Sequence, residues 1–64
     1  MSDNTLTLTP HNNGKLGVVH VGVTTDGVVY VAGERAVLAD GESTTFSRSG
    51  VTVTRRGEEF HFSK

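Results

Sequence analysis

The sequence predicts an all-β protein: a single small domain, residues 1–64, built as an antiparallel meander of about six to seven short strands. Three observations support this fold class. Val and Thr, whose branched side chains favour strands, dominate the chain, and no window shows helical periodicity. Glycine-containing pairs recur at short intervals. Two valine-rich runs flank Asp26-Gly27, a dipeptide that is a strong hairpin signal between alternating hydrophobic residues.

The glycine-containing pairs divide the chain into its elements. They are Asn13-Gly14, Asp26-Gly27, Gly33-Glu34, Gly41-Glu42, Ser49-Gly50 and Arg56-Gly57. If each pair forms a hairpin loop, the strands span approximately residues 4–9, 16–25, 28–32, 35–39, 43–48, 51–55 and 58–62. Such a sheet must bury one face, so it is expected to roll into a small barrel or pack as a sandwich. The shortness of the strands favours the barrel.

Each strand is justified by its alternation or by its boundaries. Thr and Leu alternate in the first strand, which ends before Pro10 because proline cannot donate to a ladder. In the second strand, Val19, Val21 and Val23 share one face. The turns place Leu8 opposite Val19. Across the remaining strands they predict one buried row: Val23, Tyr30, Val37, Phe46, Val53 and Phe60.

The opposite face is mostly Thr, Ser and His, with one apolar interruption. The interrupting residues are Val18, Val29, Val31, Ala36 and Leu38. Strands that are apolar on both faces are usually covered on both. These five residues are therefore either covered within the monomer or exposed as a protein-binding patch, and the sequence leaves both interpretations open.

Length and composition restrict the possible partners. A chain of 64 residues buries only about 60% of its unfolded surface, so we expect the thin core to be completed by self-association or by docking on a larger protein assembly. The net charge of −1 argues against a dedicated nucleic-acid binder. No long apolar run or signal peptide is present, so we expect no membrane association and a cytoplasmic or virion location.

The sequence offers no catalytic or metal-binding motif. Without cysteine, disulfides, thiolate ligands and Cys nucleophiles are excluded. Glu58 and Glu59 are sequence neighbours, so on a strand they point to opposite faces and cannot form an acid–base pair. His20 and His61 share a predicted face but meet only if a barrel closes. We therefore expect no enzyme, no cofactor and no metal site.

The expected function is that of a non-enzymatic structural or interaction protein, a small β module acting through protein–protein contacts. A virion accessory or capsid decoration protein is the most specific form of this expectation. The alternative is a small β-barrel that binds nucleic acid. Its candidate contact residues are Lys15, Arg48, Arg55 and Arg56. Arg55 is also expected to form a surface ion pair with Glu58 across the last hairpin.

Overall fold

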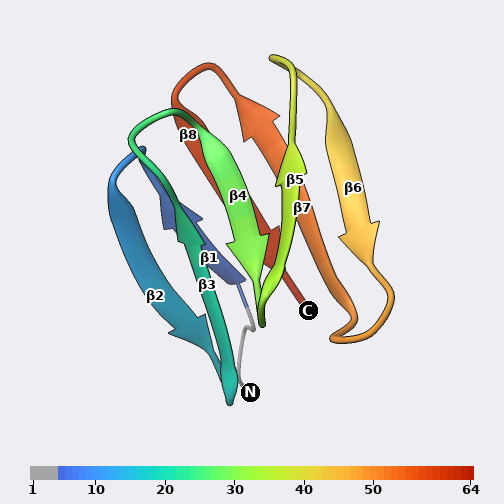
Figure 1. The fold of residues 1–64 in the computed structure, drawn as a ribbon. Helices are drawn as coiled ribbons and strands as arrows, with labels where there is room; N and C mark the ends of the chain where they lie inside the picture. Colours follow the sequence, from blue (N-terminus) through green and yellow to red (C-terminus); the bar gives the residue numbers. More distant parts are fainter. Residues whose placement is uncertain (1–4) are drawn as a thin grey trace.

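The computed structural model describes residues 5–64, which form eight strands in two four-stranded antiparallel sheets (Figure 1). The strands are β1 (Thr5–Leu8), β2 (Asn12–Leu16), β3 (Val19–Val23), β4 (Val28–Val31), β5 (Glu34–Val37), β6 (Ser43–Phe46), β7 (Val51–Arg56) and β8 (Glu59–Ser63). The sheet with strand order β2-β3-β4-β5 is called the front sheet, and the sheet with order β1-β8-β7-β6 the back sheet. The predicted all-β class is confirmed.

The two sheets lie face to face, so the predicted sandwich is present and the barrel is not (Figure 1). Within each sheet, strands that follow each other in sequence are neighbours, as in a meander. The exception is β1, which pairs with β8 and brings the two ends of the described chain together. The chain passes from one sheet to the other at the β1–β2 turn and through residues 38–42.

The first predicted hairpin is wrong, because Asn13-Gly14 lies inside β2. Turns occur instead at residues 10–11 and 17–18, which makes β2 a separate strand. The first turn is held by Asn12, whose amide donates to Thr9 Oγ1 over 2.7 Å and also to Thr9 O and Pro10 O. A Cβ atom on Gly14 would lie 2.8 Å from Leu6 Cδ2. The side chain of Leu6 therefore packs directly over Gly14, so this glycine serves the packing of β1 against β2 and not a turn.

The β4–β5 turn lies one residue earlier than predicted, at Ala32-Gly33. Ala32 has a φ of 49° and Gly33 a φ of 88°, the two positive values that a type I′ hairpin requires. Tyr30 consequently pairs with Arg35 and not with Val37. In the β3–β4 hairpin, Val23 pairs with Val29 and not, as predicted, with Tyr30. Tyr30 therefore lies on the outer face of the front sheet, and Val37 lies on the same face, so the prediction that they belong to the buried row is wrong. Tyr30 is half-buried there and Val37 is 76% exposed.

The strand pairings in the back sheet also differ from the predicted ones, because the turns lie at other residues than predicted. Phe46 pairs with Val51 across a four-residue loop, and Val53 pairs with Phe62 because the last turn is at Gly57-Glu58. Leu8, predicted opposite Val19, pairs with Phe60 instead. The other members of the predicted row remain inward-facing and buried.

A single core fills the space between the sheets, and no polar or charged residue among residues 5–64 is buried in it. Its members are Leu8, Leu16, Val19, Val21, Val23, Val29, Val31, Leu38, Phe46, Val51, Val53, Phe60 and Phe62. Phe60 and Phe62 are the largest of them and are at most 1% exposed. Because both sheets contribute to this core, one copy of the chain covers its own apolar faces.

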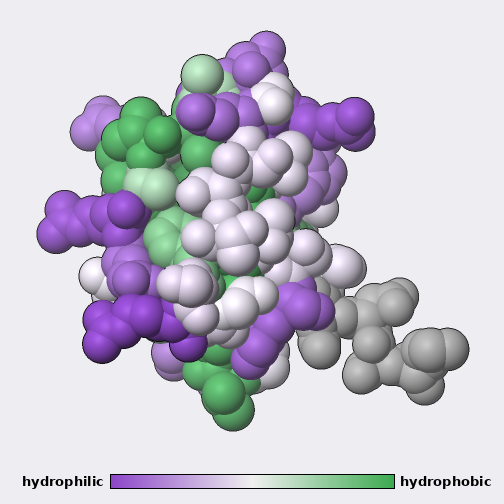
Figure 2. Space-filling model, turned by 90° about the vertical axis from the view of Figure 1, so that its right-hand side faces the viewer, coloured by the Kyte–Doolittle hydropathy of each residue, from purple (hydrophilic) through white to green (hydrophobic). Residues whose placement is uncertain are grey.

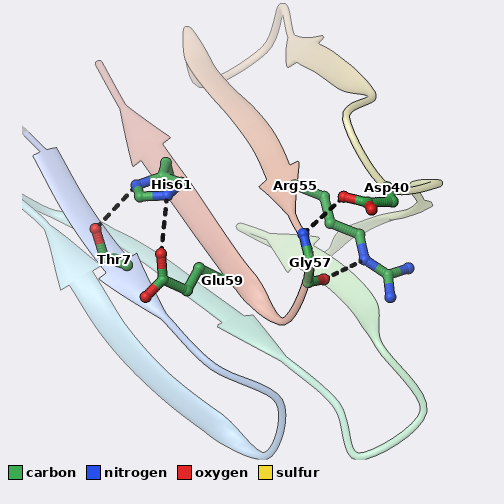
Figure 3. A network of polar contacts seen from close by, with 6 residues as sticks. All are labelled: Thr7, Asp40, Arg55, Gly57, Glu59 and His61. Atoms are coloured by element: carbon green, nitrogen blue, oxygen red, sulfur yellow. Dashed lines mark hydrogen bonds and ion pairs between the residues drawn. The ribbon is translucent and has the colours of Figure 1, made fainter.

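Arg55 links residues 38–42, which connect the two sheets, to the β7–β8 hairpin through hydrogen bonds. Its backbone N–H donates to Glu42 O and its carbonyl accepts from Gly41 N–H, at 2.9 and 2.8 Å. Its guanidinium donates to Leu38 O and to Gly57 O, both at 2.8 Å, and lies 5.4 Å from the centre of the Phe60 ring. Asp40 Oδ1 accepts from Gly57 N–H at 2.7 Å (Figure 3). The predicted ion pair with Glu58 is replaced by these contacts.

Candidate binding site on the front sheet

The outer faces of the two sheets carry different chemistry. The back sheet presents rows of small hydroxyl side chains: Thr5, Thr7, Ser43, Thr45, Thr52, Thr54 and Ser63. The front sheet presents one aromatic, two apolar and several basic or amide side chains: Asn13, Lys15, His20, Val28, Tyr30, Arg35 and Val37. Viewed from the side of β5 and β6, the surface has apolar groups at the upper left and at the bottom, a central area of near-neutral hydropathy, and hydrophilic side chains along both edges (Figure 2).

Tyr30 occupies the middle of the front sheet's outer face. One row of paired residues runs across all four strands, in the order Asn13, Gly22, Tyr30 and Arg35. A Cβ atom on Gly22 would lie 2.5 Å from both Cζ and Oη of Tyr30. The phenol end of Tyr30 therefore lies directly over the Gly22 backbone, an aromatic side chain covering a glycine of the neighbouring strand. This arrangement directs the phenol from β4 across β3 towards β2.

A cleft of about 360 Å³ opens beside Tyr30, between the β1–β2 turn and the β3–β4 loop. Its lining residues are His11, Asn12, Asn13, Val23, Thr24, Thr25 and Tyr30. Its volume falls within the range of about 300–1,000 Å³ that is usual for small-molecule sites.

Hydrogen bonds hold the walls of the cleft together. His11 N–H donates to Val23 O over 2.9 Å, and Thr25 Oγ1 lies 3.1 Å from His11 Nδ1, so the β1–β2 turn is tied to the β3–β4 loop. The loop is closed internally, because Val28 N–H donates to Thr24 Oγ1 over 3.0 Å and Thr24 N–H donates to Val28 O over 2.9 Å. The cleft is thus preformed and does not depend on an unsupported loop.

Val28 and Val37 form an apolar pair at the β5 edge of the same face. They are directly opposite each other on β4 and β5. Val28 is half-buried, whereas Val37 is 76% exposed. Within residues 5–64, β5 has a hydrogen-bonded strand on one side only, so this pair borders a free sheet edge.

The five residues predicted as a protein-binding patch do not form one exposed surface. Val29, Val31 and Leu38 are core residues, and Ala36 is half-buried against them. Only Val18, in the β2–β3 turn, is strongly exposed, at 86%. The prediction of an exposed patch is therefore wrong, and the alternative that these strands are covered within the monomer is correct. The cover is the back sheet, which the seven-strand layout did not provide.

The four predicted nucleic-acid contacts are also dispersed. Lys15 lies on the outer face of the front sheet, and Arg48 lies in the β6–β7 loop. Arg55 is engaged with the connection between the sheets, and Arg56 is opposite Glu59 at the far end of β7 from Arg48. The structure thus provides no continuous basic surface made of these residues.

The histidines lie far from one another in the topology. His20 is on the outer face of the front sheet and His61 on the outer face of the back sheet, so the sandwich does not bring them together. Within the described residues, no group of three or more His, Asp or Glu side chains is placed to hold a metal ion. In the same part of the chain, no helix has the length and apolarity needed to cross a membrane.

One hydroxyl–imidazole–carboxylate arrangement occurs on the back sheet. Thr7 Oγ1 lies 3.1 Å from His61 Nδ1, and His61 Nε2 lies 3.6 Å from Glu59 Oε1 (Figure 3). This order of groups matches a catalytic triad, but acyl transfer also requires oxyanion donors and a substrate site. The three residues lie on an open sheet face and do not line the cleft beside Tyr30. The contacts therefore describe a polar cross-strand cluster.

No protein-family model, curated protein or solved structure matches this chain. The site consequently depends on geometry alone. Tyr30 was not predicted as a site residue because a two-residue turn at Asp26-Gly27 would pair it with Val23 and place it in the core. The observed β3–β4 loop is longer and is closed by hydrogen bonds between Thr24 and Val28, so Val29 pairs with Val23 and Tyr30 lies on the outer face.

Proposed function

We propose that this chain is a non-enzymatic interaction protein that acts through protein–protein contacts at the β5 edge of its front sheet. The observation that carries the proposal is the exposure of Val37 beside Val28 at that edge. An apolar surface at an unpaired strand invites the addition of another strand, because the backbone N–H and C=O groups of the edge lack partners. The partner that we favour is a second copy of the chain.

A second copy fits this edge because β5 can pair with itself in antiparallel fashion. If Ala36 pairs with its own counterpart, Val37 of one copy lies opposite Arg35 of the other, and the two guanidinium groups are kept apart. The aliphatic part of Arg35 can then cover Val37. The joined front sheets would have eight strands, which is within the usual range for open sheets.

The proposal is tested by size-exclusion chromatography with light scattering over a wide range of protein concentration. We expect a dimer that forms with increasing concentration and is lost in Val37→Lys, because lysine at an edge opposes strand addition. Val18→Lys is the matched control, since Val18 is even more exposed than Val37 but lies in the β2–β3 turn, away from β5; this variant should dimerise like the parent chain. A monomer at every concentration, or a dimer that Val37→Lys leaves intact, would contradict self-association through this edge.

A role as a virion accessory or capsid decoration protein is a narrower form of this proposal and stays a prediction. The nucleic-acid alternative has less support, since its four basic residues are dispersed over the molecule. The two functions differ in their response to salt: affinity for a single-stranded oligonucleotide should fall steeply as salt is raised, whereas an apolar strand-edge dimer should persist.

A further inference from the structure

We propose that the cleft beside Tyr30 is a binding site for a neutral saccharide. The inference concerns the end of the front sheet where β2, β3 and β4 meet the β1–β2 turn. It goes beyond the proposed protein–protein function, does not depend on it, and uses different residues from those at the β5 edge.

The chemistry of the lining favours an uncharged ligand with many hydroxyl groups. Among the described residues, the cleft is bordered by two carboxamides, two threonine hydroxyls, one imidazole, one phenol and the side chain of Val23, and by no Asp, Glu, Lys or Arg. Such a set offers many uncharged donors and acceptors but no fixed charge with which to bind an ion. A ligand with many neutral hydroxyl groups matches it.

The Tyr30 ring is placed where a sugar ring could pack against it. The apolar C–H faces of a sugar ring pack against the electron-rich face of an aromatic side chain, while its hydroxyls reach polar groups at the rim. Tyr30 is the single aromatic residue of the lining and is seated on Gly22, so it provides such a surface in a fixed place. Asn13 is in the same row on the far side of Gly22, on the edge towards which the phenol is directed.

Some polar groups of the cleft are engaged in hydrogen bonds of the fold, and others are free to bind a ligand. The Asn12 amide nitrogen is committed to Thr9 and Pro10, where it stabilises the β1–β2 turn. The Asn13 amide, which is exposed, has no hydrogen bond to another residue within the described chain. It can therefore donate and accept simultaneously, which suits two adjacent hydroxyl groups of a sugar. Because the turn and the loop are already tied together, little ordering is needed on binding.

A nucleotide fits the same place less well. A base could stack on Tyr30, but no cationic side chain lines the cleft to receive a phosphate; Arg35 is on β5, on the opposite side of Tyr30 from Asn13. We therefore assign the site to a neutral sugar and use a nucleotide as the competing probe.

The experiment is a titration of the ¹⁵N-labelled full chain, followed by two-dimensional NMR. The probes are the neutral methyl glycosides of glucose, galactose, mannose and N-acetylglucosamine, with adenosine 5′-monophosphate as the competing ligand. We expect at least one glycoside to shift the amide signals of residues 11–13, 22–25 and 30, with a dissociation constant of about 1–10 mM for a single sugar ring. Signals of the back sheet should not move.

Four variants connect the shifts to the site. Tyr30→Ala should weaken binding about tenfold, and Asn13→Ala several-fold, whereas Tyr30→Phe should change the affinity by less than about threefold because it keeps the ring. Thr54→Ala is the control, since it removes a half-buried hydroxyl from the outer face of the back sheet, and it should bind like the parent chain. Asn13→Ala and Tyr30→Phe keep the test valid if Tyr30→Ala does not fold.

Three results would overturn the assignment: no shift with any glycoside, shifts confined to the back sheet, or an affinity unaffected by both Tyr30→Ala and Asn13→Ala. Tighter binding of adenosine 5′-monophosphate than of every glycoside would also reject a neutral-sugar site. None of these results affects the dimer test at Val37, so the failures of the two proposals can be told apart.

Discussion

Replacing Gly22 by alanine tests directly whether the Tyr30 ring packs on the Gly22 backbone. The added Cβ atom would lie 2.5 Å from Cζ and Oη and 2.8 Å from Cε1 of Tyr30, distances too short for real side-chain contacts. The β3 backbone is fixed by pairing on both sides, so the phenol must move. We therefore expect Gly22→Ala to displace Tyr30 from the middle of the front sheet.

The size of the effect follows from two opposing contributions. Alanine in place of glycine within a strand stabilises by about 0.5–1 kcal/mol, because glycine loses more conformational freedom on folding. Displacing the flexible end of the half-buried Tyr30 side chain costs about 0.5–1.5 kcal/mol, less than overpacking a core. The two contributions nearly cancel, so Gly22→Ala should leave the free energy of unfolding within about 1 kcal/mol of the parent value. In a Tyr30→Ala background the clash is absent, and the same substitution should raise that free energy by about 0.5–1 kcal/mol.

The assay is urea unfolding followed by far-ultraviolet circular dichroism, applied to the double-mutant cycle of Gly22→Ala and Tyr30→Ala. We expect a coupling energy of about 0.5–1.5 kcal/mol between the two positions. Tyr30→Phe is the matched control, since it keeps the ring and should keep most of the coupling. Tyr30 is the only tyrosine of the chain and there is no tryptophan, so intrinsic fluorescence reports its displacement separately. An equal effect of Gly22→Ala on the free energy of unfolding in both backgrounds would contradict the packing of Tyr30 on Gly22.

Three further substitutions test other parts of the fold by the same unfolding measurement. Ala32→Asn should raise the free energy of unfolding by about 0.5–1 kcal/mol, since asparagine tolerates the positive φ of the type I′ turn better than alanine; no gain would contradict this turn geometry. Arg55→Lys should lower the free energy of unfolding by about 1–3 kcal/mol, because the two hydrogen bonds from the guanidinium to Leu38 O and Gly57 O are lost. Arg56→Lys is the control and should leave the free energy of unfolding unchanged. Equal effects of the two substitutions would disprove the structural role of Arg55. Phe60→Ala should cost about 3–5 kcal/mol, enough to unfold much of so small a domain, and a folded variant of unchanged stability would rule out this core.

The fold class was predictable because strand preference and turn signals both act locally. Valine, threonine and closely spaced glycines predict short strands whatever their partners are. Register was less predictable, because neighbouring dipeptides compete for each turn. At Ala32, Gly33 and Glu34, a shift of one residue in the turn decides whether Tyr30 faces Val37 or Arg35.

The pairing of β1 with β8 was not predictable from local signals. Asn13-Gly14 has the composition of a hairpin turn, and a nearby hairpin is the simplest interpretation of it. Gly14 instead lies in a strand, where the side chain of Leu6 packs over it. This contact can be inferred only after β1 has been placed beside β2, and no dipeptide signal places it there. The burial of Val29 and Val31 follows from the division of the chain into two sheets that face each other.

The closed core also bears on how the exposed residues are interpreted. A small domain often leaves apolar residues exposed because its core is incomplete, and the sequence suggested this explanation. Here the core is shared between two sheets of one chain and contains no buried polar residue within residues 5–64. The exposure of Val37 therefore does not result from an unfinished core. At an edge strand such a residue is a liability for aggregation unless something covers it. The dimer proposed at the β5 edge would cover Val37, and the chromatography of Val37→Lys tests whether it does.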